Sequence, residues 1–158
     1  IGTNMSYFWP AAAIQTVAGF FFGGWGAIAA TLFPSLSNAL TDGTPSHIIG
    51  LIPANFVQSF LPLMFGNIIG RTSASLSLRN VFMFIIGCAI LPHILGAFLG
   101  CGTLLWLGDI SNVAEFWKTF RVWTVGNIPC SIFFGVLLIK TVWPVLFDCD
   151  LIYRNYFR

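Results

Sequence analysis

Residues 5–40 read MSYFWPAAAIQTVAGFFFGGWGAIAATLFPSLSNAL, and this stretch decides the fold. It contains no charged residue, and none comes before it, since the first charged residue of the chain is Asp42. One helix that crosses about 30 Å of hydrocarbon needs about 20 residues. The stretch is therefore long enough for two helices, and its glycine-rich segment 23–26 marks the point of reversal. We predict a helical hairpin inside a membrane.

The composition of the chain extends this prediction to its whole length. Of its 158 residues, 57% are hydrophobic and 8% are charged, whereas a soluble domain carries about 25% charged residues. A β-barrel would show alternating segments of roughly 10 residues, but the apolar runs here are continuous. The sequence thus predicts an all-α fold, a polytopic transmembrane bundle that forms a single domain over residues 1–158 and has the lipid bilayer around it.

The length rule divides the chain into about five spans. These are expected at residues 7–22, 25–40, 48–69, 81–107 and 122–146. Two further segments are amphipathic. We expect residues 108–121 to form a connector in the headgroup plane, and residues 148–158 to form a surface-bound tail.

The distribution of Lys and Arg gives the expected orientation. One side of the membrane would carry Arg71, Arg79, Lys140, Arg154 and Arg158, and the other side Lys118 and Arg121. The positive-inside rule then places the C-terminus and its tail in the cytoplasm. With five spans the N-terminus lies outside, and because it starts without Met, we expect a sixth helix before residue 1. The net charge of +2 is small and scattered, so nucleic acid is not an expected partner.

Several segments together resemble one family of bacterial membrane sensor domains, the MASE1 family. The segment 8–40 has its Trp-Pro-Ala entry, helix, glycine reversal and second helix, and the segment 54–71 carries an Asn and ends in a basic residue. The segment 117–138 is similar to its last helix, with Asn127 in place of the more usual acidic residue. This resemblance implies a sensor in the bacterial inner membrane, which recognises a small ligand or a membrane condition and acts through a cytoplasmic partner.

Two other roles stay open, and the first rests on a further resemblance. The S components of energy-coupling-factor transporters also have about six helices, a glycine-rich reversal like residues 23–26 and an Asn-containing helix like residues 53–71. That resemblance implies a subunit that binds a vitamin-sized solute and passes it to an ATP-driven module. The third role is an accessory subunit of a larger assembly, pigment-containing or not, in an energy-converting membrane.

Five residues are the candidate ligand-binding positions. Asn55 and Gln58 are three residues apart and share a helix face, where they either line a pocket or make interhelical hydrogen bonds of about 0.6–2 kcal/mol each. A histidine inside a span, His93, is a functional candidate by default. It either ligates a haem or chlorophyll, titrates, or bonds a backbone carbonyl near Pro92. Trp123 and Asn127 are four residues apart and are expected to line a cavity with His93.

No catalytic motif accompanies these positions. The sequence has no HExxH, no phosphate-binding glycine loop followed by Lys and Ser or Thr, and no pair of carboxylates inside a span. The four cysteines form no CxxC pair and fit small buried apolar residues. The chain is therefore predicted to be non-enzymatic, with no bound metal and no cofactor that its sequence identifies.

Overall fold

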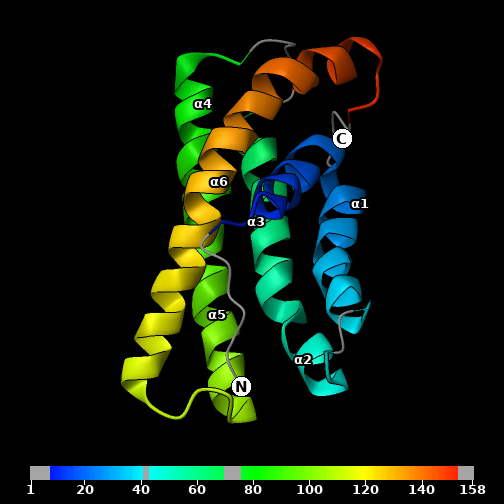
Figure 1. The fold of residues 1–158 in the computed structure, drawn as a ribbon. Helices are drawn as coiled ribbons and strands as arrows, with labels where there is room; N and C mark the ends of the chain where they lie inside the picture. The colour runs from blue at the N-terminus through cyan, green and yellow to red at the C-terminus, as the bar shows by residue number, and fades with distance from the viewer. Residues whose placement is uncertain (1–7, 41–42, 70–75, 153–158) are drawn as a thin grey trace.

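The computed structural model describes residues 8–40, 43–69 and 76–152, and in these ranges the chain is helical and contains no strand (Figure 1). The elements in order are α1 (Ala11–Leu40), α2 (Pro45–Gly50), α3 (Ile52–Ile69), α4 (Leu78–Phe84), the π-helical turn η1 (Ile85–Ile90), α5 (Leu91–Leu107) and α6 (Val113–Asp148). The all-α prediction is confirmed. Four helical segments are long and apolar enough to cross a membrane: Ala11–Leu40, Pro45–Ile69, Leu78–Leu107 and Val113–Asp148.

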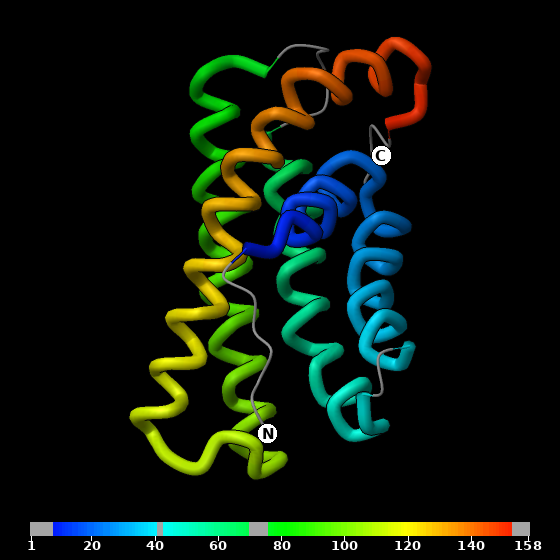
Figure 2. The backbone as a smooth tube through the Cα atoms, viewed as in Figure 1, coloured from blue at the N-terminus to red at the C-terminus, as the bar shows by residue number. Residues whose placement is uncertain are grey.

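Helix α1 is broken at Gly23, within the segment predicted to fold back. Gly23 has φ 62° and ψ −136°, a conformation that is open essentially to glycine alone. The carbonyl oxygen of Ala18 would lie 1.9 Å from a Cβ atom built on Gly26, although residues eight apart in a straight helix are separated by about 12 Å. The chain therefore reverses here, and Figure 2 shows the two arms meeting near the top of the view.

The predicted count of five spans is not supported, because the first arm of α1 is too short to be a span. Residues 11–22 form a helix of about 18 Å at 1.5 Å per residue, which is too short for about 30 Å of hydrocarbon. The main chain of Trp9 donates a hydrogen bond to the carbonyl of Gly126 at 3.4 Å, so this arm begins beside the middle of α6. The predicted spans 7–22 and 25–40 are two arms of one broken helix, and the described residues hold four candidate spans.

Helix α3 packs against α1 more extensively than any other pair of elements in the described ranges. The closest approach is at Gly19, where a Cβ atom would lie 2.2 Å from the carbonyl oxygen of Ser59. Two backbones approach this closely only where one helix lacks a side chain, which is the role that small residues have in membrane bundles. The predicted helix 48–69 is divided at Leu51, the C-terminal cap of α2.

Helix α6 begins much earlier than the predicted residue 122. The side chain of Asn112 accepts a hydrogen bond from the main chain of Glu115 at 2.9 Å, and the Glu115 carboxylate accepts one from the main chain of Ser111 at 2.9 Å. The first bond is that of an N-terminal cap, the second ties the Glu115 carboxylate to the residue before the cap, and together they start the helix at Val113. Of the predicted connector 108–121, residues 113–121 are thus the first turns of α6. The predicted tail 148–158 begins at the last residue of α6, and residues 153–158 lie outside the described ranges.

An aromatic cluster closes the end of the bundle at which α1 reverses. The ring of Trp143 in α6 lies 5.3 Å from that of Phe20 and 5.4 Å from that of Phe21, between centroids. Phe84 of α4 adds a third contact, with its ring 5.3 Å from Phe20. Phe20, Phe84 and Trp143 are fully buried, so this cluster holds the reversal of α1 against α4 and α6.

The Gly19 contact predicts the effect of one added methyl group. Gly19→Ala places Cβ against the Ser59 carbonyl, so α1 and α3 must move apart, and overpacking of this kind destabilises by about 1–3 kcal/mol. We expect a lower thermal unfolding midpoint for the detergent-purified variant. Gly102→Ala is the matched control, because a Cβ atom there meets nothing within 4 Å. Equal midpoints for the two variants would show that the close approach of α1 and α3 is wrong.

Candidate functional site

A polar cluster lies in the middle of the otherwise apolar bundle. His93 of α5 is fully buried, and its Nε2 atom lies 2.6 Å from the Ser131 hydroxyl and 3.1 Å from the Thr16 hydroxyl. Thr16 also donates to Ser131 at 3.4 Å. At 1.5 Å per residue, His93 is about 20 Å along the helix from either end of the segment Leu78–Leu107. The cluster therefore joins α1, α5 and α6 at mid-depth.

The position of His93 follows from the irregular helix that precedes it. The π-helical turn η1 ends one residue before α5, and Pro92 is the second residue of α5. Proline donates no main-chain hydrogen bond, and π-helical turns frequently occur at functional sites. His93 is the third residue of α5 and directly follows this irregular segment.

Helix α3 supplies the next side of the cluster through Gln58, which is 2% exposed. Its amide packs on α5 one turn beyond His93, where a Cβ atom on Gly96 would lie 2.3 Å from Gln58 Nε2. Neither Gln58 Nε2 nor His93 Nδ1 has a hydrogen-bond partner among the described residues. Ser35 Oγ, in the second arm of α1, is a third such atom. Buried polar atoms are nearly always paired, so all three need an explanation, and two of them belong to the packing of α3 on α5.

Asn55 lies one turn before Gln58 and contributes mainly its backbone carbonyl to the hydrogen bonds beside the cluster. Its carbonyl accepts hydrogen bonds from Gln15 Nε2 at 3.3 Å and from the Ser59 hydroxyl at 2.9 Å. The Asn55 side chain is 7% exposed. This carbonyl therefore ties the first arm of α1 to α3 beside the cluster.

The structure brings four of the five candidate residues to the interior. Asn127 is buried on α6, one turn before Ser131. Trp123 is only half-buried, and its ring fills the space at Gly100, where a Cβ atom would lie 2.3 Å from the ring. Trp123 thus packs against α5 two turns away from His93.

The dense packing around His93 does not favour its interpretation as a haem or chlorophyll ligand. Its Nε2 atom already faces two hydroxyls, and the residue has no exposed surface. A tetrapyrrole would have to displace Thr16 and Ser131. No group of three metal-ligating side chains is found in the described part of the chain.

The two hydroxyl partners of His93 were not predicted as site residues. Thr16 and Ser131 are common residue types in apolar helices, and they lie 77 and 38 positions from His93 in the sequence. The available signal was the spacing of four between Asn127 and Ser131, which places two polar groups on one face of α6.

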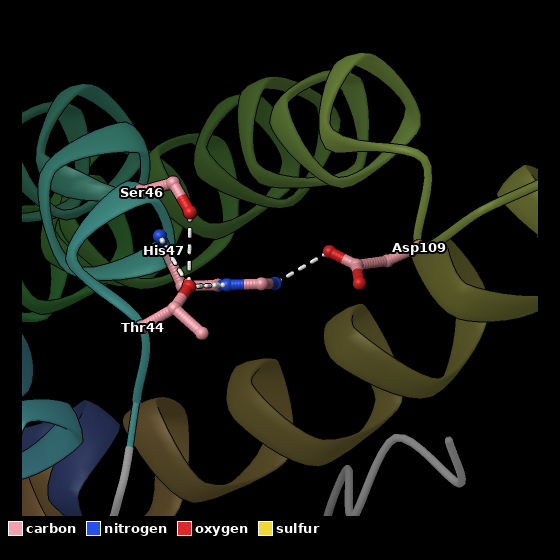
Figure 3. A network of polar contacts seen from close by, with 4 residues as sticks. All are labelled: Thr44, Ser46, His47 and Asp109. Carbon is pink, nitrogen blue, oxygen red and sulfur yellow. Dashed lines mark hydrogen bonds and ion pairs between the residues drawn. The ribbon is translucent and has the colours of Figure 1, made fainter.

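A second polar network lies between the start of α2 and the loop after α5, at the opposite end of the bundle from α4 in Figure 1, and Figure 3 shows it from close by. His47 of α2 places Nε2 2.5 Å from the Asp109 carboxylate and Nδ1 2.5 Å from the Thr44 hydroxyl, which also lies 2.9 Å from the Ser46 hydroxyl. This Thr–His–Asp arrangement was not predicted, because Asp109 is 62 positions from His47 in the sequence.

This second network has a structural explanation. Thr44 is the N-terminal cap of α2, and its hydroxyl accepts the main-chain N–H of His47 at 3.5 Å. The hydroxyl is thus used for capping, and the ion pair joins the start of α2 to the loop between α5 and α6. We call these residues, Thr44, His47 and Asp109, the loop clasp.

Comparisons with protein families, with curated proteins and with solved structures found no match to this chain. The resemblances to MASE1 domains and to S components therefore stay predictions.

The loop clasp predicts energetic coupling between His47 and Asp109. The two side chains are 31% and 21% exposed, and ion pairs near the surface contribute about 0.2–1 kcal/mol. We expect a double-mutant cycle of His47→Ala and Asp109→Ala, measured by unfolding in mixed detergent micelles, to give a coupling energy in that range.

The cycle has an internal control in Glu115, which is at the same end of the bundle and pairs with Ser111 instead. His47→Ala and Glu115→Ala should be additive. If His47→Ala and Asp109→Ala are also additive, the clasp does not hold the two loops together.

Proposed function

We propose that this chain is a non-enzymatic integral membrane protein that binds a small polar ligand at mid-depth and acts through another chain. The observation that carries the proposal is the pair of buried, unpartnered atoms Gln58 Nε2 and His93 Nδ1. An unsatisfied buried polar group costs about 1–3 kcal/mol, and hydrocarbon offers no water to pair with it. A ligand with hydrogen-bonding groups between α3 and α5 would satisfy both atoms.

The broken helix favours a solute-binding role of the S-component type. The first arm of α1 begins beside Gly126 in the middle of α6 and brings Thr16 to the polar cluster. Half-helices whose N-termini lie near the midplane are typical of proteins that bind solutes for transport. We therefore place substrate binding for a transport partner first.

A sensory role of the MASE1 type is favoured by a different observation. Helix α6 is continuous from Ser131 in the cluster to Asp148 at the end of the bundle. A ligand that changes the position of Ser131 would thus move the last helix of the described chain. In this role the partner is a cytoplasmic signalling protein, and the setting is the bacterial inner membrane or a related energy-converting membrane.

One experiment tests ligand binding through Gln58. Gln58→Met keeps the packing against Gly96 but removes the unpartnered amide. If Gln58 exists to bind a ligand, the ligand-free variant is more stable than the ligand-free wild type, because function and stability oppose each other at such sites. We expect a higher unfolding midpoint together with loss of the small molecule that co-purifies in mild detergent, detected by native mass spectrometry.

The matched control is Thr141→Val, since the Thr141 hydroxyl is exposed and bonds the Leu137 carbonyl of its own helix at 2.9 Å. This variant should keep the co-purifying molecule. A wild-type protein without any bound small molecule, or a Gln58→Met variant that still retains it, would rule out this site. Proteins that co-purify in the same detergent distinguish a transport ATPase from a signalling partner.

The proposed orientation places Arg79, Lys140 and the end of α6 on the cytoplasmic side. Cys149 is the exposed cysteine of the four, and the other three are buried. A membrane-impermeant maleimide should therefore label Cys149 in inverted membrane vesicles but not in intact cells or spheroplasts. Val113 is at the other end of α6 and 69% exposed, and a variant that combines Val113→Cys with Cys149→Ser should show the opposite pattern. Labelling of both positions from one side would contradict a spanning α6.

A further inference from the structure

The two arms of α1 enclose a cavity of about 380 Å³ that is separate from the polar cluster. The first arm and the residues before it contribute Trp9, Ile14 and Gln15, and the second arm contributes Ala29, Phe33 and Ser37. Its volume is within the range of sites for small molecules, about 300–1,000 Å³. None of the five candidate residues lines it.

The chemistry of the cavity wall is almost entirely apolar. No charged residue lines it, and residues at its rim are open to the surroundings, with Ile14 64% and Phe33 65% exposed. If α1 lies in a membrane as proposed above, this rim faces hydrocarbon. An occupant would then enter from the lipid phase and would have an apolar body.

Gln15 gives the cavity one polar position. It is 7% exposed, and Nε2 donates to the Asn55 carbonyl at 3.3 Å, the one side-chain hydrogen bond that the described residues provide for it. A glutamine amide carries two N–H donors and an accepting oxygen. One N–H and the oxygen are thus left for a ligand, and both are neutral.

We propose that this cavity binds a lipid-soluble molecule with an apolar chain or ring and one uncharged hydroxyl or carbonyl group, which Gln15 holds. The reversal at Gly23 creates the site, because it sets the two arms of one helix opposite each other. The small side chains Ala18 and Ala29 leave the space between the arms open. This inference rests on the membrane location proposed above, but on none of the residues of the polar cluster.

The test uses the full chain in phospholipid nanodiscs and two photoreactive probes. One is a long-chain alcohol that carries a diazirine, and the other is the same chain without the hydroxyl. We expect the alcohol to label residues 9–18 and 29–37 about 2–10-fold more than the hydrocarbon probe does, as the strength of one hydrogen bond implies. Labelling of α5 and α6 on their exposed faces should be equal for the two probes.

Three variants make the result specific. Ala29→Phe fills the cavity and should remove the labelling of both segments, whereas Gly102→Phe adds the same ring on α5, where a Cβ atom meets nothing within 4 Å, and should not. Gln15→Leu should keep labelling by the hydrocarbon probe but abolish the preference for the alcohol.

Each other outcome overturns the proposal. Labelling spread evenly over all helices, or unchanged in Ala29→Phe, would show that the cavity is no binding site while leaving the membrane location intact. Equal labelling by both probes in the wild type would remove the role of Gln15. If neither probe labels any helix, both this inference and the proposed membrane location are wrong.

Discussion

The reversal of α1 at Gly23 is the constraint on which the rest of the structure depends. Inside hydrocarbon, a break in a helix leaves main-chain groups that must be paired within the protein, so it persists only where other elements support it. Here the support comes from the contact of Gly19 with the Ser59 carbonyl and from the rings of Phe20 and Trp143. With the first arm held in this way, Thr16 reaches His93 and Gln15 reaches Asn55.

The centre of the bundle combines complete and incomplete hydrogen bonding. Thr16, Ser131 and His93 Nε2 satisfy one another, whereas His93 Nδ1 and Gln58 Nε2 do not. A partly satisfied polar network is less favourable than an apolar core of the same shape, so stability alone does not explain it. The ligand proposed above would account for it, and would link the packing of α3 on α5 to the proposed function.

The two ends of the bundle are closed by different kinds of interaction. Aromatic rings from α1, α4 and α6 close the end near Gly23, and they are buried. The loop clasp closes the other end, where His47 and Asp109 are partly exposed and their attraction is screened by solvent. Apolar burial is the larger contribution at the first end, so the clasp is the weaker of the two connections.

Helicity, an apolar character suited to a membrane and a reversal between residues 23 and 26 could be predicted from the sequence, because they follow from the scarcity of charge and the conformational freedom of Gly23. The start of α6 at Val113 is also set locally, by the bonds among Ser111, Asn112 and Glu115, but hydropathy does not report it. The folded structure was needed to show that the first arm of α1 begins beside Gly126, that His93 meets Thr16 and Ser131, and that His47 pairs with Asp109. Each of these depends on contacts between residues far apart in sequence, whereas hydropathy and spacing report only on neighbours within one helix.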